Sequence, residues 1–113
     1  MIKFLLLMIF SSLAFANNLS LSCSGISQFE LVGATGVKEE KQEREYIFND
    51  LILKDLNDIQ CISDNEIIEC DSNFLNVRSL KFDLKSMKLT DFISGNKGFG
   101  QYIESFKGQC QKK

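Results

Sequence analysis

The stretch CISDNEIIEC, residues 61–70, encloses eight residues between two of the chain's four cysteines. If the chain turns at residues 65–66, Cys61 faces Cys70 directly across a β-hairpin, and residues 63–65 (Ser-Asp-Asn) supply turn-forming side chains. Directly opposed strand residues have Cβ atoms about 4.5–5.5 Å apart, close to the geometry of a disulfide. The stretch therefore predicts a hairpin with a Cys61–Cys70 disulfide.

This pairing leaves Cys23 and Cys110, whose disulfide would tie the first strand of the domain to the last. Two other connectivities of four cysteines stay open on counting grounds. A redox role for Cys61 and Cys70 is the competing interpretation, but redox pairs are typically closer together, as in Cys-x-x-Cys.

The first residues of the chain predict export. Residues 4–10 form an apolar run after Lys3, and Ala14-Phe15-Ala16 ends it with small residues where a signal peptidase cuts. We expect a signal peptide at residues 1–16, a single secreted domain at 17–113, and a periplasmic or secreted protein without stable membrane insertion. An even number of cysteines in such a small exported domain indicates a disulfide framework.

Alternating apolar residues predict an all-β fold. Residues 19–23 read Leu-Ser-Leu-Ser-Cys, and residues 77–85 place Leu80, Phe82 and Leu84 on one face. Such segments recur about every 8 to 12 residues with turn signals between them, as in an antiparallel β-sandwich or β-barrel. We expect about seven or eight strands and two disulfides.

Three segments are assigned from local signals. Gly25 is expected to end the first strand, and 27–33 to form a second. The charged block at 37–45 is interpreted as a solvated hairpin tip, with a short helix or a recognition protrusion as alternatives. Residues 94–100 are expected to form a glycine-rich loop before a final strand.

Composition excludes several functions. The chain has a formal net charge of −2 and no basic block, so nucleic acid is not an expected partner. Because the chain lacks histidine and its cysteines are expected to be bridged, we predict no zinc or copper site, no cofactor and no enzymatic activity. Binding of hard cations by carboxylates stays open.

The layout resembles small exported, disulfide-bonded bacterial β proteins of unassigned function. The resemblance rests on an early cysteine after a signal peptide, a paired hairpin cysteine, FDLKSMKL at 82–89 and FKGQC at 106–110. An Asp-Arg-x-Thr-Gly-x-Leu hairpin is frequent in those proteins. Asp83, Ser86 and Leu89 fit that pattern here, while Leu84 and Met87 depart from it.

A second, local resemblance involves SGNKGFGQYIESFKG, residues 94–108. It is similar to the Ser-Gly…Tyr…Phe-Trp-x-Lys-Gly stretch of the periplasmic inhibitors of c-type lysozyme, which are small disulfide-bonded β-barrels. The resemblance implies that Ser94 and Lys107 enter a glycosidase cleft, with Tyr102 and Phe106 as supports. The chain departs from the family because no Trp follows Phe106 and extra residues precede Tyr102.

The function expected from these features is that of an exported, noncatalytic binding module. Its partner would be a protein of the cell envelope or extracellular space, and inhibition of an envelope-directed hydrolase such as lysozyme is one candidate role. The alternative is a structural or accessory cell-envelope protein with no small-molecule ligand.

Overall fold

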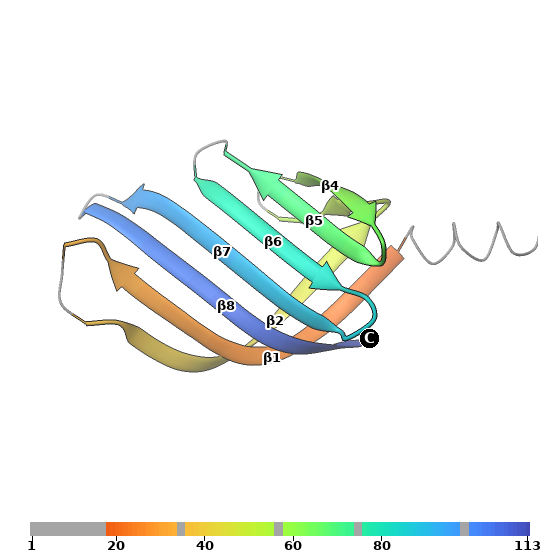
Figure 1. The fold of residues 1–113 in the computed structure, drawn as a ribbon, viewed down its shortest axis with the longest axis horizontal. Coiled ribbons are helices and arrows are strands. Elements are labelled where there is room, and N and C mark those ends of the chain that lie inside the picture. The colour runs from red at the N-terminus through yellow and green to blue at the C-terminus, as the bar shows by residue number, and fades with distance from the viewer. Residues whose placement is uncertain (1–17, 34–35, 56–57, 74–75, 98–99) are drawn as a thin grey trace, which may run out of the picture.

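The protein forms a closed antiparallel ring of eight strands in which each strand pairs with its neighbours in sequence and β8 returns to β1 (Figure 1). The computed structural model describes residues 18–33, 36–55, 58–73, 76–97 and 100–113, so the predicted signal peptide lies outside the described residues. The strands are β1 (Asn18–Leu31), β2 (Lys38–Asn49), β3 (Ile52–Leu53), β4 (Ile59–Asp64), β5 (Ile67–Ser72), β6 (Val77–Asp83), β7 (Lys88–Lys97) and β8 (Gly100–Lys112).

The predicted fold class and both disulfides are confirmed. Cys61 lies directly opposite Cys70 in the β4–β5 hairpin, and the two are bonded. Cys23 lies directly opposite Cys110, and their disulfide links β1 to β8 where the ring closes. The two bridges indicate an oxidising, extracytoplasmic compartment, because such bonds rarely persist in a reducing cytosol.

The β4–β5 turn falls at residues 65–66, as predicted. Asn65 and Glu66 have φ angles of 51° and 68°, the left-handed conformation that both central residues of a type I′ hairpin turn require. Asn adopts this conformation readily, whereas Glu does so at a cost because of its Cβ.

Replacing Glu66 with glycine is therefore expected to stabilise the protein by about 1 kcal/mol, since the turn becomes Asn-Gly. Chemical denaturation measures the change in the free energy of unfolding. The matched control is Ser63→Gly, an exposed strand position where the same substitution is expected to destabilise by about 0.5–1 kcal/mol. A loss of stability in Glu66→Gly would contradict the turn assignment.

The prediction that Gly25 ends the first strand is wrong, because β1 continues through it to Leu31. Gly25 faces Gly108 of β8, and a Cβ atom at Gly25 would lie 1.9 Å from the carbonyl oxygen of Lys107. The glycine therefore permits a close approach of two backbones inside the ring.

The charged block is also a strand rather than a hairpin tip. It forms most of β2, which pairs with β1 along its full length but with β3 only through Phe48 and Asn49. Among the described strands, none pairs with the remaining edge of β2. Charged side chains protect such an edge from pairing with other chains, which explains a charged segment with strand geometry.

The expected glycine-rich loop at 94–100 is shorter than predicted. Strand β7 runs to Lys97 and β8 begins at Gly100; residues 98–99 lie outside the described part of the chain. Gly95 lies within β7, opposite Tyr102. A Cβ atom at Gly95 would lie 2.3 Å from the Asn76 side chain, so this glycine, like Gly25, accommodates a close neighbour.

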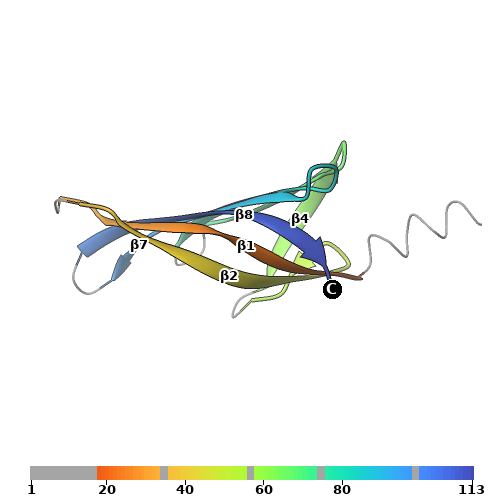
Figure 2. The ribbon, with the colours of Figure 1, turned by 90° about the horizontal axis from the view of Figure 1, so that it is seen from below.

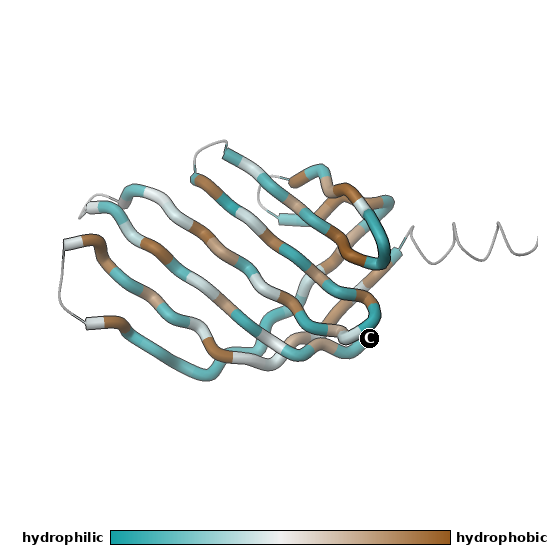
Figure 3. Tube along the Cα trace, viewed as in Figure 1, coloured by the Kyte–Doolittle hydropathy of each residue, from teal (hydrophilic) through white to brown (hydrophobic). Residues whose placement is uncertain are grey.

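The core fills the closed part of the ring, and apolar residues alternate with polar ones along the strands around it (Figure 3). Leu80 and Phe82 are fully buried, as the alternating pattern predicts, while Leu84 packs against the core from the turn. The largest fully buried side chains are Phe48, Phe82, Phe106, Leu21, Leu53, Leu80, Leu89, Cys23 and Cys70.

The strands differ greatly in length, and this positions the candidate site. β1, β2, β7 and β8 span 14, 12, 10 and 13 residues, whereas β3 has 2 and β4 and β5 have 6 each. The long strands run beyond the short ones as a curved sheet, seen edge-on in Figure 2. We call this part the open end of the barrel.

Candidate ligand-binding site at the open end

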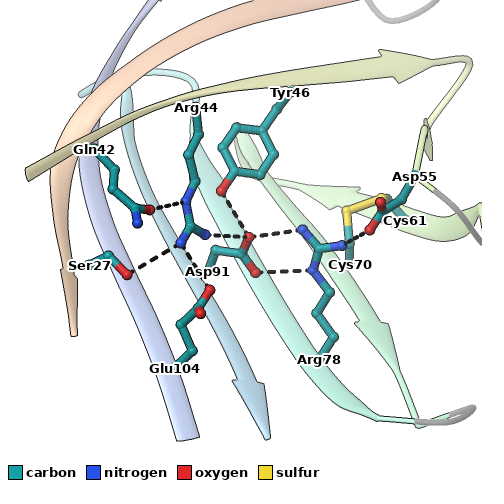
Figure 4. A network of polar contacts seen from close by, with 10 residues as sticks. All are labelled: Ser27, Gln42, Arg44, Tyr46, Asp55, Cys61, Cys70, Arg78, Asp91 and Glu104. Atoms are coloured by element: carbon teal, nitrogen blue, oxygen red, sulfur yellow. Dashed lines mark hydrogen bonds and ion pairs between the residues drawn. A yellow bond between two sulfur atoms is a disulfide. The ribbon is translucent and has the colours of Figure 1, made fainter. Parts of the chain in front are cut away.

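A buried carboxylate lies where the apolar core meets the open end. Asp91 of β7 is 2% exposed and points into the ring (Figure 4). Its carboxylate accepts a hydrogen bond from the Tyr46 hydroxyl at 2.8 Å. Arg78 of β6 donates two more, from Nε at 3.1 Å and from Nη2 at 2.9 Å. Arg78 also pairs with Asp55, which lies between β3 and β4.

Arg44 of β2 extends this network to β1 and β8. Its guanidinium lies 3.7 Å from the Asp91 carboxylate and 2.9 Å from the Glu104 carboxylate, and it donates to the Ser27 hydroxyl at 3.3 Å and to the Gln42 side-chain oxygen at 2.9 Å. The same group lies 4.5 Å from the centre of the Phe106 ring, a cation–π contact. One residue thus connects the core to the open end.

The hydrogen-bond donors of the network stay protonated. Burial, reinforced by the charge of Asp91, raises the pKa of the Tyr46 hydroxyl well above its ordinary value, so Tyr46 stays a hydrogen-bond donor. Burial disfavours the charge on Arg78, but the hydrogen bonds and charge of Asp91 outweigh it and raise the pKa of this guanidinium. In the described part of the chain, every buried side-chain nitrogen and oxygen atom has a hydrogen-bond partner. The network is therefore a fully bonded layer of polar groups at the base of the open end.

A cavity of about 300 Å³ lies beside this layer. Ser27, Gln42 and Glu104 belong to both the network and the cavity wall. Gln42 extends the hydrogen-bond network from Arg44 to Glu40, because its oxygen accepts from Arg44 and its amide nitrogen donates to Glu40. The complete lining is Ser27, Phe29, Lys38, Glu40, Gln42 and Glu104.

One wall of the cavity is aromatic. The ring of Phe29 stacks on that of Tyr102, with 5.7 Å between the ring centres and 19° between the planes. Tyr102 is 6% exposed and supports Phe29 from β8. The cavity lining thus combines one aromatic ring with several polar groups that the network holds in place.

The residues predicted from the lysozyme-inhibitor resemblance are distributed over two faces. Ser94 lies in β7 opposite Ile103, and Lys107 lies in β8 opposite Thr90. By the alternation of the strands, both point out of the ring, and four residues of strand separate them, or about 13 Å. Tyr102 and Phe106 point inward instead, where they support Phe29 and Arg44. The structure therefore does not bring Ser94 and Lys107 together.

Asp91, the central residue of the network, is not among the site residues predicted from the sequence. In 87–93 the apolar positions Met87, Leu89 and Ile93 share one face, and Asp91 interrupts them on that same face. A carboxylate at a position where the alternation predicts an apolar side chain indicates a buried ionic contact, because a buried charge needs partners. Arg44 gave a similar signal, because it shares its face with Tyr46.

Among the described residues, no group of three or more cysteine, aspartate or glutamate side chains comes together that could hold a metal ion. Within the same part of the chain, no helix has the length and apolar character needed to cross a membrane.

Comparison with known proteins adds no further assignment. No family model matches the chain, and no curated protein and no solved structure matches it either. The structure defines a small all-β antiparallel protein with two disulfides.

Proposed function

We propose that this protein is a noncatalytic binding module of an extracytoplasmic compartment, and that the open end of its barrel binds the ligand. The observation that carries the proposal is the cavity lined by Phe29, Gln42 and Glu104, whose polar groups are bonded to a buried ionic network. Side chains that are held in place before binding lose little conformational entropy when a ligand arrives. The disulfides support the compartment.

The surroundings of the two carboxylates in the cavity, Glu40 and Glu104, favour binding over catalysis. Glu104 is engaged by the Arg44 guanidinium at 2.9 Å, and Glu40 is exposed and accepts a hydrogen bond from Gln42. Neither carboxylate is buried in an apolar pocket, which is the environment of a general acid at a glycosidic bond.

The open end is also favoured over the outer face as the binding surface. An inhibitor that inserts Ser94 and Lys107 into an enzyme cleft needs both groups at one protrusion, whereas here they lie about 13 Å apart along paired strands. A structural envelope protein without a ligand has no need for a cavity with fixed polar groups.

The test is an NMR titration of the ¹⁵N-labelled protein with dialysed cell-envelope extract and, separately, with a c-type lysozyme. We expect the extract to shift the backbone amide signals of Ser27, Gln42 and Glu104. Gln42→Ala should weaken the response about tenfold, since it removes a positioned hydrogen-bonding group. Gln60→Ala, at an exposed position of β4, is the matched control and should leave it unchanged.

Three results would contradict the proposal. The first is an extract that shifts no signal at the open end. The second is an equal loss of response in Gln42→Ala and Gln60→Ala. The third is tight binding of lysozyme that Lys107→Ala abolishes. That result would place the binding surface on the outer face of the barrel.

A further inference from the structure

We infer that the ligand of the open end is a neutral carbohydrate, bound with one sugar ring against Phe29. This inference rests on the proposed function and names its ligand class. It follows from three features of the cavity: the aromatic wall, the kind of polar groups around it and the balance of their charges.

The aromatic wall suits a sugar ring. A pyranose presents C–H groups on one face, and such a face packs on the electron-rich face of an aromatic ring. Phe29 lines the cavity, and its ring stacks on the nearly parallel ring of Tyr102. A single flat ring is too little apolar surface for a lipid or another wholly apolar ligand, which takes a predominantly apolar pocket.

The polar groups suit hydroxyls. A hydroxyl both donates and accepts, so it pairs equally with the carboxylate oxygens of Glu40 and Glu104 and with the ammonium of Lys38. Planar amide and carboxylate groups present two polar atoms side by side, as neighbouring hydroxyls of a sugar do. Gln42 and Glu104 are held by Arg44, so their positions are set before the ligand binds.

The charges are balanced, which argues against ionic ligands. Lys38 and Glu40 line the same cavity with opposite charges, and the guanidinium of Arg44 neutralises Glu104. No excess of positive charge is left for a phosphate, and no excess of negative charge for a polyamine. The volume of about 300 Å³ is small for a ligand site and fits the end of a glycan.

The test titrates the ¹⁵N-labelled protein with three neutral trisaccharides: maltotriose, cellotriose and chitotriose. We expect at least one of them to shift the amide signals of Phe29, Gln42 and Glu104 at millimolar concentration. Phe29→Ala should raise the dissociation constant about tenfold. The matched control is Phe92→Ala, which removes a phenylalanine that is 39% exposed elsewhere in the sheet and should leave the constant unchanged.

The outcomes separate this inference from the proposed function. If no trisaccharide shifts the open end but envelope extract does, the carbohydrate assignment is wrong and the binding module stands. If the extract also fails, both are wrong. Tighter binding of inorganic phosphate or spermidine than of every sugar would overturn the inference, as would an equal effect of Phe92→Ala. Cleavage of a bound trisaccharide would overturn the noncatalytic part of the proposal.

Discussion

Replacing Cys23 and Cys110 together with alanine is expected to lower the free energy of unfolding by about 4.6 kcal/mol, against about 2.7 kcal/mol for replacing Cys61 and Cys70. The difference arises because the bridges restrict the unfolded chain unequally. The partners are 87 residues apart in the first bridge and 9 in the second. The longer loop loses more conformational freedom when it is closed.

The two double variants are controls for each other. All four cysteines are buried, at 6% exposure or less, and each pair is directly opposed in the ring, so both variants remove similar packing. Urea denaturation of the two variants and the unchanged protein measures the free energies. A larger loss on replacing Cys61 and Cys70 would show that the short bridge does more than fix the register of its hairpin.

Replacing Asp91 with alanine is expected to cost about 3–5 kcal/mol, because it leaves buried positive charge without its partner. Asp91 is the shared acceptor for Tyr46 and Arg78 and the ion-pair partner of Arg44. Without it, the donors of Arg78 lose two bonds in a site that water does not reach freely. The Tyr46 hydroxyl loses its acceptor at the same time.

Thermal and urea denaturation measure this loss, with Asp71→Ala, at an exposed position of β5, as the matched control; it should change stability by less than about 0.5 kcal/mol. Adding Arg78→Met to Asp91→Ala is expected to recover part of the loss, because it removes one of the unpaired charges. If Asp91→Ala were as mild as Asp71→Ala, the network would not form the base of the open end.

The parts of the fold that depend on local pattern could be predicted from the sequence. The spacing of Cys61 and Cys70 and the turn residues between them determine the register of β4 and β5. The alternation around Leu80 and Phe82 identifies a strand with one buried face. In both cases the information lies within about ten residues, where strand geometry is regular.

The remaining features depend on neighbours that are distant in sequence. Gly25 resembles a strand end, and only the backbone of β8 beside it explains why glycine lies there. The charged segment of β2 resembles a loop because its edge is exposed, and its pairing with β1 is not visible in its composition. Side chains along the exposed edge of a sheet need not be apolar, because no other strand pairs with that edge.

The candidate site was predictable only in part. Tyr102 and Phe106 are four residues apart and so lie on one face of a strand, and the structure shows that this face points inward. The network joins Arg78 and Asp91 of the β6–β7 hairpin to Arg44 of β2, and Arg44 meets them only after the ring closes. No local spacing rule connects Arg44 to the other two residues, so the sequence alone does not identify the open end.

The measurement that tests the account most directly is peptide mapping of the disulfides in the exported protein under nonreducing conditions. The account predicts one linked pair of peptides containing Cys23 and Cys110, another containing Cys61 and Cys70, and no free thiol. A link from Cys61 to Cys23 or Cys110, or free thiols in the exported chain, would contradict the strand register and with it the closed ring that forms the site.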